Sequence, residues 1–302
     1  MPQAKIQVFL FTYNRPDYVQ KTVDSIFAQD YDDFELIISD NSTDNRTKDV
    51  YEQYDHPKLT YIQRVPSVTP EEHFNTICSE IASEYVVFFH DDDIMLPTYL
   101  SETIKVLEND PAIAAAGSNG FFIYGDEYSN DIFIKRQNDE AVKIFDNPSV
   151  LANVYLRRDP IAPFPSYMYR SRFLEGIHMD AKKNGLYSDA IFILEIMRHG
   201  GLAWVMTPQI YYRLHHGQLS KMADIQDYLK FLRYLYINVA ITRNSPETIF
   251  FNRIGWCIWL KYSWKETLKK HPRRYFKVFR IMLPYLLQNK KQQILNLFRK
   301  RK

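Results

Sequence analysis

YVVFFHDDD, residues 85–93, is the stretch of this sequence that decides the fold. Its first five residues are β-branched or aromatic, and they predict a buried strand of a parallel sheet. Three carboxylates, Asp91, Asp92 and Asp93, follow at the carboxyl end of that strand, where open α/β sheets bind their ligands. Carboxylates this close raise one another's pKa unless a cation lies among them. The stretch therefore predicts a metal site that holds a phosphorylated substrate, with a solvated acidic turn as the alternative.

Strands and helices alternate around this stretch. We expect strands at 5–13, 34–39, 59–63, 85–89 and 112–117, and helices at 17–29, 45–55, 70–82 and 97–109. This order of βαβ units predicts an α/β fold with a doubly wound, mainly parallel sheet.

The second half of the chain is less regular. Residues 118–165 read as connecting loops that build an acceptor pocket, 186–199 as a helix, and 202–214 as two strand-like runs around Thr207-Pro208. From about residue 223 onward the pattern is helical. We therefore expect a domain at 1–220, with halves at 1–117 and 118–220, followed by a basic helical C-terminal region at 221–302.

Composition places the chain among globular proteins, because 46% of its 302 residues are hydrophobic and 15% are aromatic. Cys78 and Cys257 form no metal-ligand spacing, so a reducing compartment is expected. The first residues show no signal peptide, and no run of about 18 apolar residues predicts a membrane-spanning helix. These features together predict a cytoplasmic location.

The net charge of +2 hides an asymmetry between the two parts of the chain. Residues 1–220 contain 19 Lys+Arg and 32 Asp+Glu, whereas residues 221–302 contain 19 Lys+Arg and 4 Asp+Glu. After Glu266 there are twelve basic residues and no acidic one. Basic amphipathic helices of this kind are typical of proteins that bind an anionic membrane surface, and a helical subdomain packed on the body is the alternative. Nucleic acid is not an expected partner, because the rest of the chain is acidic and no nucleic-acid motif is present.

Polar clusters follow the ends of several expected strands. Thr12, Tyr13, Asn14 and Arg15 follow the first strand, and Asp40 ends the second. The carboxyl ends of neighbouring parallel strands meet at one crevice, so we expect these side chains to lie near the three aspartates. The chain has no Gly-x-Gly-x-x-Gly or P-loop motif and only 9 glycines. A metal ion would then have to bind the phosphates.

Residues 6–110 resemble the nucleotide-binding half of the GT-A glycosyltransferases of family 2, the inverting enzymes of bacterial surface-polysaccharide type. The resemblance rests on FTYNRP (11–16), IISDNSTD (37–44), the helix of Asn75 and FFHDDDIMLP (88–97), and more weakly on LYSDA (186–190) and YYRLHHGQLS (211–220). It implies a GT-A sheet, a nucleotide-sugar donor such as a UDP-sugar, and a saccharide or lipid-linked saccharide acceptor. It also implies a divalent metal, Mn²⁺ or Mg²⁺, and work at the inner face of the cell membrane.

The resemblance also implies roles for individual residues. Residues that would line the nucleotide pocket are Thr12, Tyr13, Asn14, Arg15, Asp40, Asn75 and Asp91. The metal would be held by Asp92, Asp93 and His215, and Asp189 would be the catalytic base. Two positions depart from the family pattern: His90 stands at the first position of the Asp-x-Asp motif, and Ser188 precedes the base.

Plainer interpretations remain open at this point. Asp40 could cap the helix near residue 45, Asp189 could be a solvated helix residue, and His215 an ordinary surface histidine. Asn75 taken alone suits a structural role better than a catalytic one. A sugar-phosphate nucleotidyltransferase is a rival class, but it usually opens with a Gly-rich signature that this chain lacks. A non-catalytic carbohydrate-binding scaffold on a GT-A fold is the third possibility.

Overall fold

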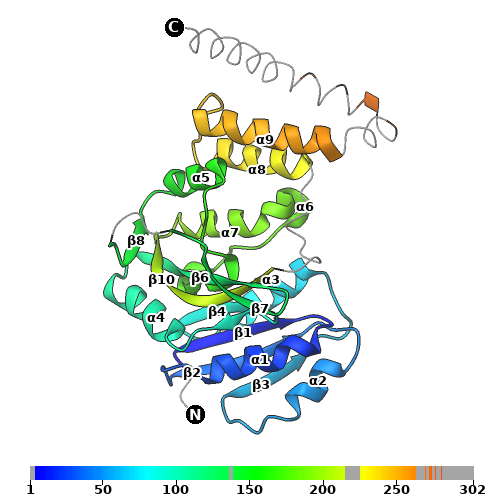
Figure 1. Ribbon diagram of the computed structural model, residues 1–302, viewed down its shortest axis with the longest axis vertical. Helices are drawn as coiled ribbons and strands as arrows, with labels where there is room; N and C mark the ends of the chain where they lie inside the picture. The colour runs from blue at the N-terminus through cyan, green and yellow to red at the C-terminus, as the bar shows by residue number, and fades with distance from the viewer. Residues whose placement is uncertain are drawn as a thin grey trace. The chain divides into compact units, whose positions relative to one another are not determined.

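The computed structural model describes residues 4–135, 139–214 and 225–262, together with a few isolated positions between 269 and 280 (Figure 1). These residues form two compact units. The first unit takes its residues from 1–151, 160–181 and 188–218, and the second from 152–159, 182–187 and 219–302. The units therefore do not follow a single cut in the sequence, and the expected boundary at residue 220 stays a prediction.

A mixed sheet forms the centre of the first unit. Its strands are β1 (Ile6–Thr12), β2 (Phe34–Asp40), β3 (Leu59–Gln63), β4 (Tyr85–His90), β5 (Ile94–Met95), β6 (Ile113–Tyr124), β7 (Glu127–Ile132), β8 (Val142–Phe145), β9 (Met168–Arg170) and β10 (Gly201–Leu214). The order is β3-β2-β1-β4-β9-β6-β10-β5, with β7 on β6 and β8 on β10. The pairs among β3, β2, β1 and β4 are parallel, as is β6 with β10, and β9 is antiparallel to both its neighbours. The predicted doubly wound, mainly parallel sheet is confirmed.

Helices connect the strands (Figure 1). They are α1 (Pro16–Phe27), α2 (Arg46–Tyr51), α3 (Pro70–Glu80), α4 (Tyr99–Asn109), α5 (Pro148–Arg157), α6 (Ala181–Asn184), α7 (Ser188–Ile196), α8 (Ile225–Asn238) and α9 (Pro246–Tyr262). Sequence fixes some of their starts directly. Thr69 and Glu72 form a capping box at the start of α3, and Pro70 takes the first helical position, where its missing N–H costs nothing.

The sheet has helices packed on both faces. On one face, the alternating residues Ile6, Val8 and Leu10 of β1 form a fully buried cluster with apolar residues of α1 and α4. On the other face, Phe74 of α3 stacks on Phe11, 5.8 Å between ring centroids, and meets rings from β4 and α7 at 4.8 and 5.0 Å. Both faces of the parallel core are therefore covered, and polar chemistry is confined to the strand ends.

Residues 118–165 differ from the expectation of connecting loops. β6 continues as far as Tyr124 and turns at Gly125, which has a φ of 63°, into the antiparallel strand β7. β8 and α5 also lie in this range. The sequence does not show the alternation of apolar and polar residues that is typical of strands, because aromatic residues occupy both faces of the hairpin. Phe121 contacts Tyr211 on one face, and Phe122 contacts Phe133 on the other.

Residues 202–214 form one strand rather than two runs. β10 pairs with β6 through the whole of its length, and its register shifts between Val205 and Pro208 and again between Pro208 and Ile210. Proline cannot donate to the ladder, so the strand passes Thr207-Pro208 with a bulge instead of ending there. The uninterrupted strand carries Tyr212 and Arg213 to the edge where β4 ends.

The second unit is built on helices α8 and α9, which confirms a helical C-terminal part. Aromatic rings form its core: Tyr187 stacks on Phe231 at 4.6 Å, and Tyr228 meets Phe251 at 5.1 Å between centroids. No helix among the described residues is both long and apolar enough to cross a bilayer. Most of the basic segment after Glu266 lies outside the described residues.

Candidate active site

The acidic loop, defined here as Asp91–Asp93, follows β4 at the carboxyl edge of the parallel strands. Its three side chains are buried, with 3%, 6% and 0% of each residue exposed. The Thr22 hydroxyl of α1 lies 2.9 Å from the carbonyl oxygen of Asp91 and 2.8 Å from that of Asp93. The alternative of a solvated acidic turn is therefore excluded, because the loop is buried and held from the helix that follows β1.

Asp91 faces the loop after β1. Its carboxylate accepts the backbone N–H of Tyr13 at 3.1 Å and a guanidinium N–H of Arg15 at 3.3 Å. The same Arg15 nitrogen donates to Asp92 at 2.8 Å. Burial raises the pKa of Asp91 to about 7, the charge of Asp92 adds to the increase, and Arg15 opposes it. The structure thus brings three of the predicted site residues, Arg15, Asp91 and Asp92, into direct contact.

Asp93 has one satisfied and one unsatisfied oxygen. Its Oδ1 accepts the backbone N–H of Arg213 at 2.9 Å, whereas its buried Oδ2 has no hydrogen-bond partner among the described residues. Burial, together with the charge of Asp92, raises the pKa of Asp93 well above its ordinary value. A buried carboxylate oxygen without a donor is costly unless a cation meets it.

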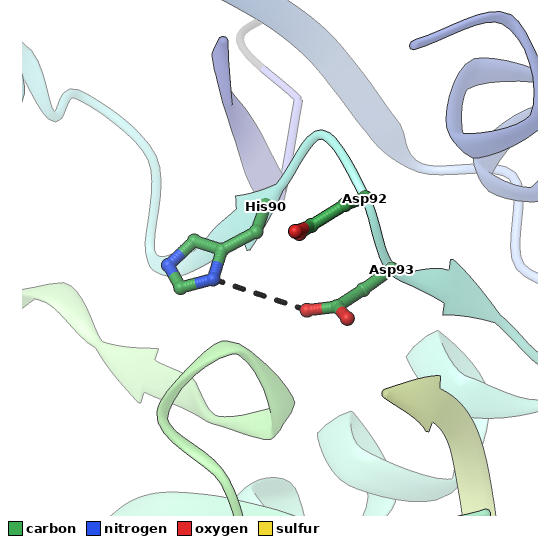
Figure 2. A group of neighbouring side chains, drawn as sticks. All are labelled: His90, Asp92 and Asp93. Atoms are coloured by element: carbon green, nitrogen blue, oxygen red, sulfur yellow. Dashed lines mark ion pairs between the residues drawn. The ribbon is translucent and has the colours of Figure 1, made fainter. Parts of the chain in front are cut away.

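His90, Asp92 and Asp93 could hold such a cation (Figure 2). One ligand atom from each lies within 4.8 Å of the others, and His90 Nδ1 is 3.9 Å from Asp93 Oδ2. This group fits a divalent metal on two grounds: its donors are carboxylates and an imidazole, and it contains the unsatisfied Asp93 oxygen. The sequence predicted Asp92 and Asp93 as ligands, and the structure adds His90. The third predicted ligand, His215, lies outside the described residues.

Arg213 is a site residue that was predicted only as part of a motif. It is 1% exposed, and its Nε donates to the carbonyl oxygen of Asp92 at 2.9 Å. Its guanidinium also bonds the carbonyl of Gly125 and the carboxylate of Asp126, and it stacks over the ring of Tyr18 at 4.4 Å. Arg213 therefore ties β10 and the β6–β7 turn to the acidic loop. The available signal in the sequence was that Arg213 is the single charged residue of this strand.

Asp40 ends β2 and is fully buried. Its carboxylate accepts the hydroxyl of Thr12 at 2.8 Å, the backbone N–H of Ser42 at 2.9 Å and the hydroxyl of Tyr61 at 2.7 Å. Burial and this last bond raise the pKa of Tyr61. Asp40 does not cap the following helix, since α2 has Asn45 at its N-cap position. Thr12 and Asp40 are thus brought together as predicted neighbours, while their contact with a nucleotide stays a prediction.

The loop between β1 and α1 has a fixed backbone. Asn14 adopts a φ of 55°, donates its N–H to the hydroxyl of Ser42 at 2.8 Å, and accepts the N–H of Thr43 at 3.0 Å. The ring of Tyr13 is 52% exposed beside it. A left-handed asparagine is tolerated here because its side chain bonds the neighbouring backbone.

Asn75 lies apart from this group. Its amide donates to the carbonyl of Met179 and accepts the N–H of the same residue, each at 2.9 Å. Both ends of the amide are therefore used to hold the segment before α6 against α3. These two bonds give Asn75 a structural role, and its role in the nucleotide pocket stays a prediction.

Asp189 begins α7, where its carboxylate accepts the N–H of Ala190 at 2.7 Å. Desolvation of the carboxyl by the surrounding protein raises its pKa above the ordinary value, while the residue as a whole keeps a surface open to solvent. Burial raises the pKa of Tyr212 on β10, and the charges of Asp93, Asp92 and Asp189 add to the increase. The Tyr212 hydroxyl therefore feels the charges of both Asp189 and the acidic loop. Sequence reasoning did not single out Tyr212.

The model of the family "Glycosyl transferase family 2" matches residues 7–187. The glycosyltransferase GlyA of Streptococcus pneumoniae is 23% identical over 236 residues, which are 72% of this chain and 32% of that protein. The GalNAc(5)-diNAcBac-PP-undecaprenol beta-1,3-glucosyltransferase of Campylobacter jejuni is 32% identical over 104 residues, which are 33% of this chain and 34% of that protein. The chain thus spans about a third of the length of these curated relatives.

Solved structures share the fold. Residues 1–349 of S. aureus TarS, in complex with UDP-GlcNAc, align with a TM-score of 0.61 at 15% identity. The alignment covers 87% of this chain and 75% of that one. At this level of identity the likeness shows the fold, which is the GT-A type of sheet.

Proposed function

Because the chain belongs to glycosyl transferase family 2, we propose that it is a metal-dependent inverting glycosyltransferase. It would move a sugar from a UDP-sugar to a hydroxyl group of a saccharide or lipid-linked saccharide in surface-polysaccharide synthesis. The observation that carries the proposal is the cluster of His90, Asp92 and Asp93 at the carboxyl edge of the parallel strands, with a buried Asp93 oxygen that lacks a hydrogen-bond donor.

Donor binding follows from the elements that meet at this edge. Tyr13 offers an exposed ring beside Asp91, and Thr12, Asp40 and Tyr61 form a hydrogen-bonded group at the ends of β1, β2 and β3. A divalent cation, when bound, would offset the charge that develops on the leaving nucleotide diphosphate. The imidazole among the ligands favours Mn²⁺ over Mg²⁺, because Mg²⁺ prefers oxygen ligands.

Asp189 would serve as the base. Inverting transfer requires one group that takes the proton of the acceptor hydroxyl as its oxygen attacks the anomeric carbon. An exposed carboxylate with a raised pKa suits this role, since the acceptor can reach it and its basicity is closer to neutral pH.

The choice of donor and acceptor rests on the similar proteins. TarS was solved with UDP-GlcNAc, and the Campylobacter jejuni relative is named for transfer of glucose to an undecaprenol-linked saccharide. A lipid-linked acceptor would place the enzyme at the inner face of the membrane, where the basic residues after Glu266 would bind anionic lipids. Peripheral attachment of a cytoplasmic enzyme is therefore part of the proposal.

UDP binding tests the proposal directly. The full-length protein should bind UDP with Mn²⁺ and much more weakly in EDTA, measured by isothermal titration calorimetry. Asp92→Ala should abolish the dependence of UDP binding on metal. Glu102→Ala, which removes an acidic side chain from α4, serves as the matched control. A screen for hydrolysis of nucleotide-sugars with Mn²⁺ would then identify the donor. UDP affinity that is unaffected by EDTA and by Asp92→Ala would disprove the metal-dependent mechanism.

A further inference from the structure

Arg15 contacts the carboxylates that the metal would need. We propose that Arg15 is an exchangeable counter-ion: its guanidinium neutralises Asp91 and Asp92 in the nucleotide-free protein, and a divalent cation must displace it from Asp92 in order to bind. The inference rests on the proposed function, because it assumes a metal at His90, Asp92 and Asp93. It gives Arg15 a role that differs from simply lining the nucleotide pocket.

The first step of the argument is competition for one carboxylate. Arg15 Nη1 lies 2.8 Å from Asp92 Oδ2 and 3.3 Å from Asp91 Oδ1, so its charge falls between the two acids. Asp92 also belongs to the group of candidate metal ligands. Two cations on the same carboxylate repel each other strongly where water is excluded, and Asp92 is only 6% exposed. Occupation by the guanidinium therefore opposes occupation by a metal.

The second step separates Arg15 from the other arginine at the site. The Arg213 guanidinium is held by the carbonyl oxygens of Asp92 and Gly125 and by the Asp126 carboxylate, and it is buried against Tyr18. It cannot leave without breaking these contacts. The Arg15 side chain is 39% exposed, and among the described residues it forms ion pairs with Asp91 and Asp92 of the acidic loop. Arg15 is therefore the cation that can exchange.

The third step is a place for the displaced side chain. A cavity of about 400 Å³ adjoins Arg15 and is lined by Asn14, Arg15, Asp17, Tyr18, Lys21 and Asp126. Of its two carboxylates, Asp126 is already paired with Arg213, so Asp17 is the one that can receive a guanidinium that has left Asp92. The backbone before Arg15 is fixed by the bonds of Asn14 to Ser42 and Thr43, so the displacement would take place by rotation of the Arg15 side chain.

The experiment measures Mn²⁺ affinity without nucleotide, by the electron paramagnetic resonance signal of free Mn²⁺. Arg15→Met removes the charge and keeps an unbranched side chain. It should bind Mn²⁺ at least about tenfold more tightly than wild type, which is the lower end of the effect of one adjacent arginine on the affinity of a carboxylate for a proton. Arg15→Lys keeps a charge and should remain closer to wild type. Lys21→Met removes a charge from the same cavity away from the acidic loop, and should change the affinity less than about twofold, since exposed charges are screened.

Mn²⁺ affinity of Arg15→Met that equals or falls below that of wild type overturns the inference, as does equal tightening by Lys21→Met. UDP titrations on the same samples separate this failure from failure of the proposed function. If wild type binds UDP in a metal-dependent manner but Arg15→Met does not tighten Mn²⁺, only the role of Arg15 is wrong. If neither wild type nor Arg15→Met binds Mn²⁺, the metal site and the inference fail together.

Discussion

The sequence identifies Asp189 as the candidate base, but it does not reveal the environment of that side chain. Its place in LYSDA predicted a base at the start of a helix, and the structure puts it in the first turn of α7, exposed and bonded to the N–H of Ala190. The raised pKa of its carboxyl comes from protein packed around it, which no local pattern reports.

Asp189→Asn tests the base. The substitution keeps the shape and removes the basicity, so transfer should fall by about 10²–10⁴ while metal-dependent UDP binding survives. In the wild type, activity requires the ionised carboxylate. It should therefore decline as pH falls through the raised pKa of Asp189, at a pH above the ordinary aspartate value of about 3.9. Initial rates across pH, compared with UDP affinity at the same pH, check both points. Near-normal transfer by Asp189→Asn would assign the base to another residue.

The acids of the loop differ although they are neighbours in sequence. The Asp91 carboxylate accepts hydrogen bonds from Tyr13 and Arg15, whereas the Asp93 carboxylate accepts one from the backbone of Arg213 on β10. Sequence alone left the register of the Asp-x-Asp motif open between residues 90–92 and 91–93. The structure groups His90 with Asp92 and Asp93, and their roles as ligands remain predictions.

At the scale of elements, β10 decides the shape of the site. It was expected to break at Thr207-Pro208, but it continues to Leu214 and brings Arg213 beside the acidic loop. Gly120 of β6 permits this arrangement, because a Cβ there would lie only 2.5 Å from the carbonyl oxygen of Ile210 on β10.

Arg213→Met should destabilise the protein by about 1–3 kcal/mol, because the carbonyl oxygen of the buried Asp92 loses its donor and the side chain loses its bonds to Gly125 and Asp126. The bond from the backbone of residue 213 to Asp93 is retained. Chemical denaturation followed by tryptophan fluorescence measures the change in the free energy of unfolding.

Arg46→Met is the matched control for this experiment, since Arg46 is also paired with an aspartate but has a side chain that is 59% exposed. Its unfolding midpoint should change little. Equal effects of the two substitutions would show that Arg213 does not hold the loop.

For the whole molecule, charge is distributed between an acidic body and a basic C-terminal region. Helices α8 and α9 confirm the helical character of the described part of that region, and no described helix can span a bilayer. Most of the basic residues after Glu266 lie outside the described part of the chain. Binding of these residues to an anionic surface stays a proposal.

Truncation after residue 270 should release the protein from anionic liposomes, because each basic residue near the surface contributes about 1 kcal/mol. UDP binding should persist, since the candidate site residues all precede residue 220. Co-sedimentation with anionic and neutral liposomes at low and high salt measures the effect, and high salt should weaken binding by screening. If the full-length chain does not bind anionic liposomes, or if truncation abolishes UDP binding, the C-terminal region is structural and the membrane proposal is wrong.

The sequence by itself determined the alternation of strands and helices through residue 117, the buried strand before Asp91 and the edge at which polar residues gather. These features follow from periodicity and end signals, which depend on residues close together in the chain. The resemblance carried by FTYNRP and FFHDDDIMLP identified the family, which the match over residues 7–187 confirms.

Only the tertiary structure decided which groups meet. The Asp93–Arg213 bond joins residues 120 positions apart, and the two are neighbours because β10 pairs with β5 and β6 in the same sheet. The placement of Arg15 between Asp91 and Asp92 likewise depends on how β1 and β4 pair. Strand order and register set these contacts through long-range packing, and the local pattern of a sequence does not encode them.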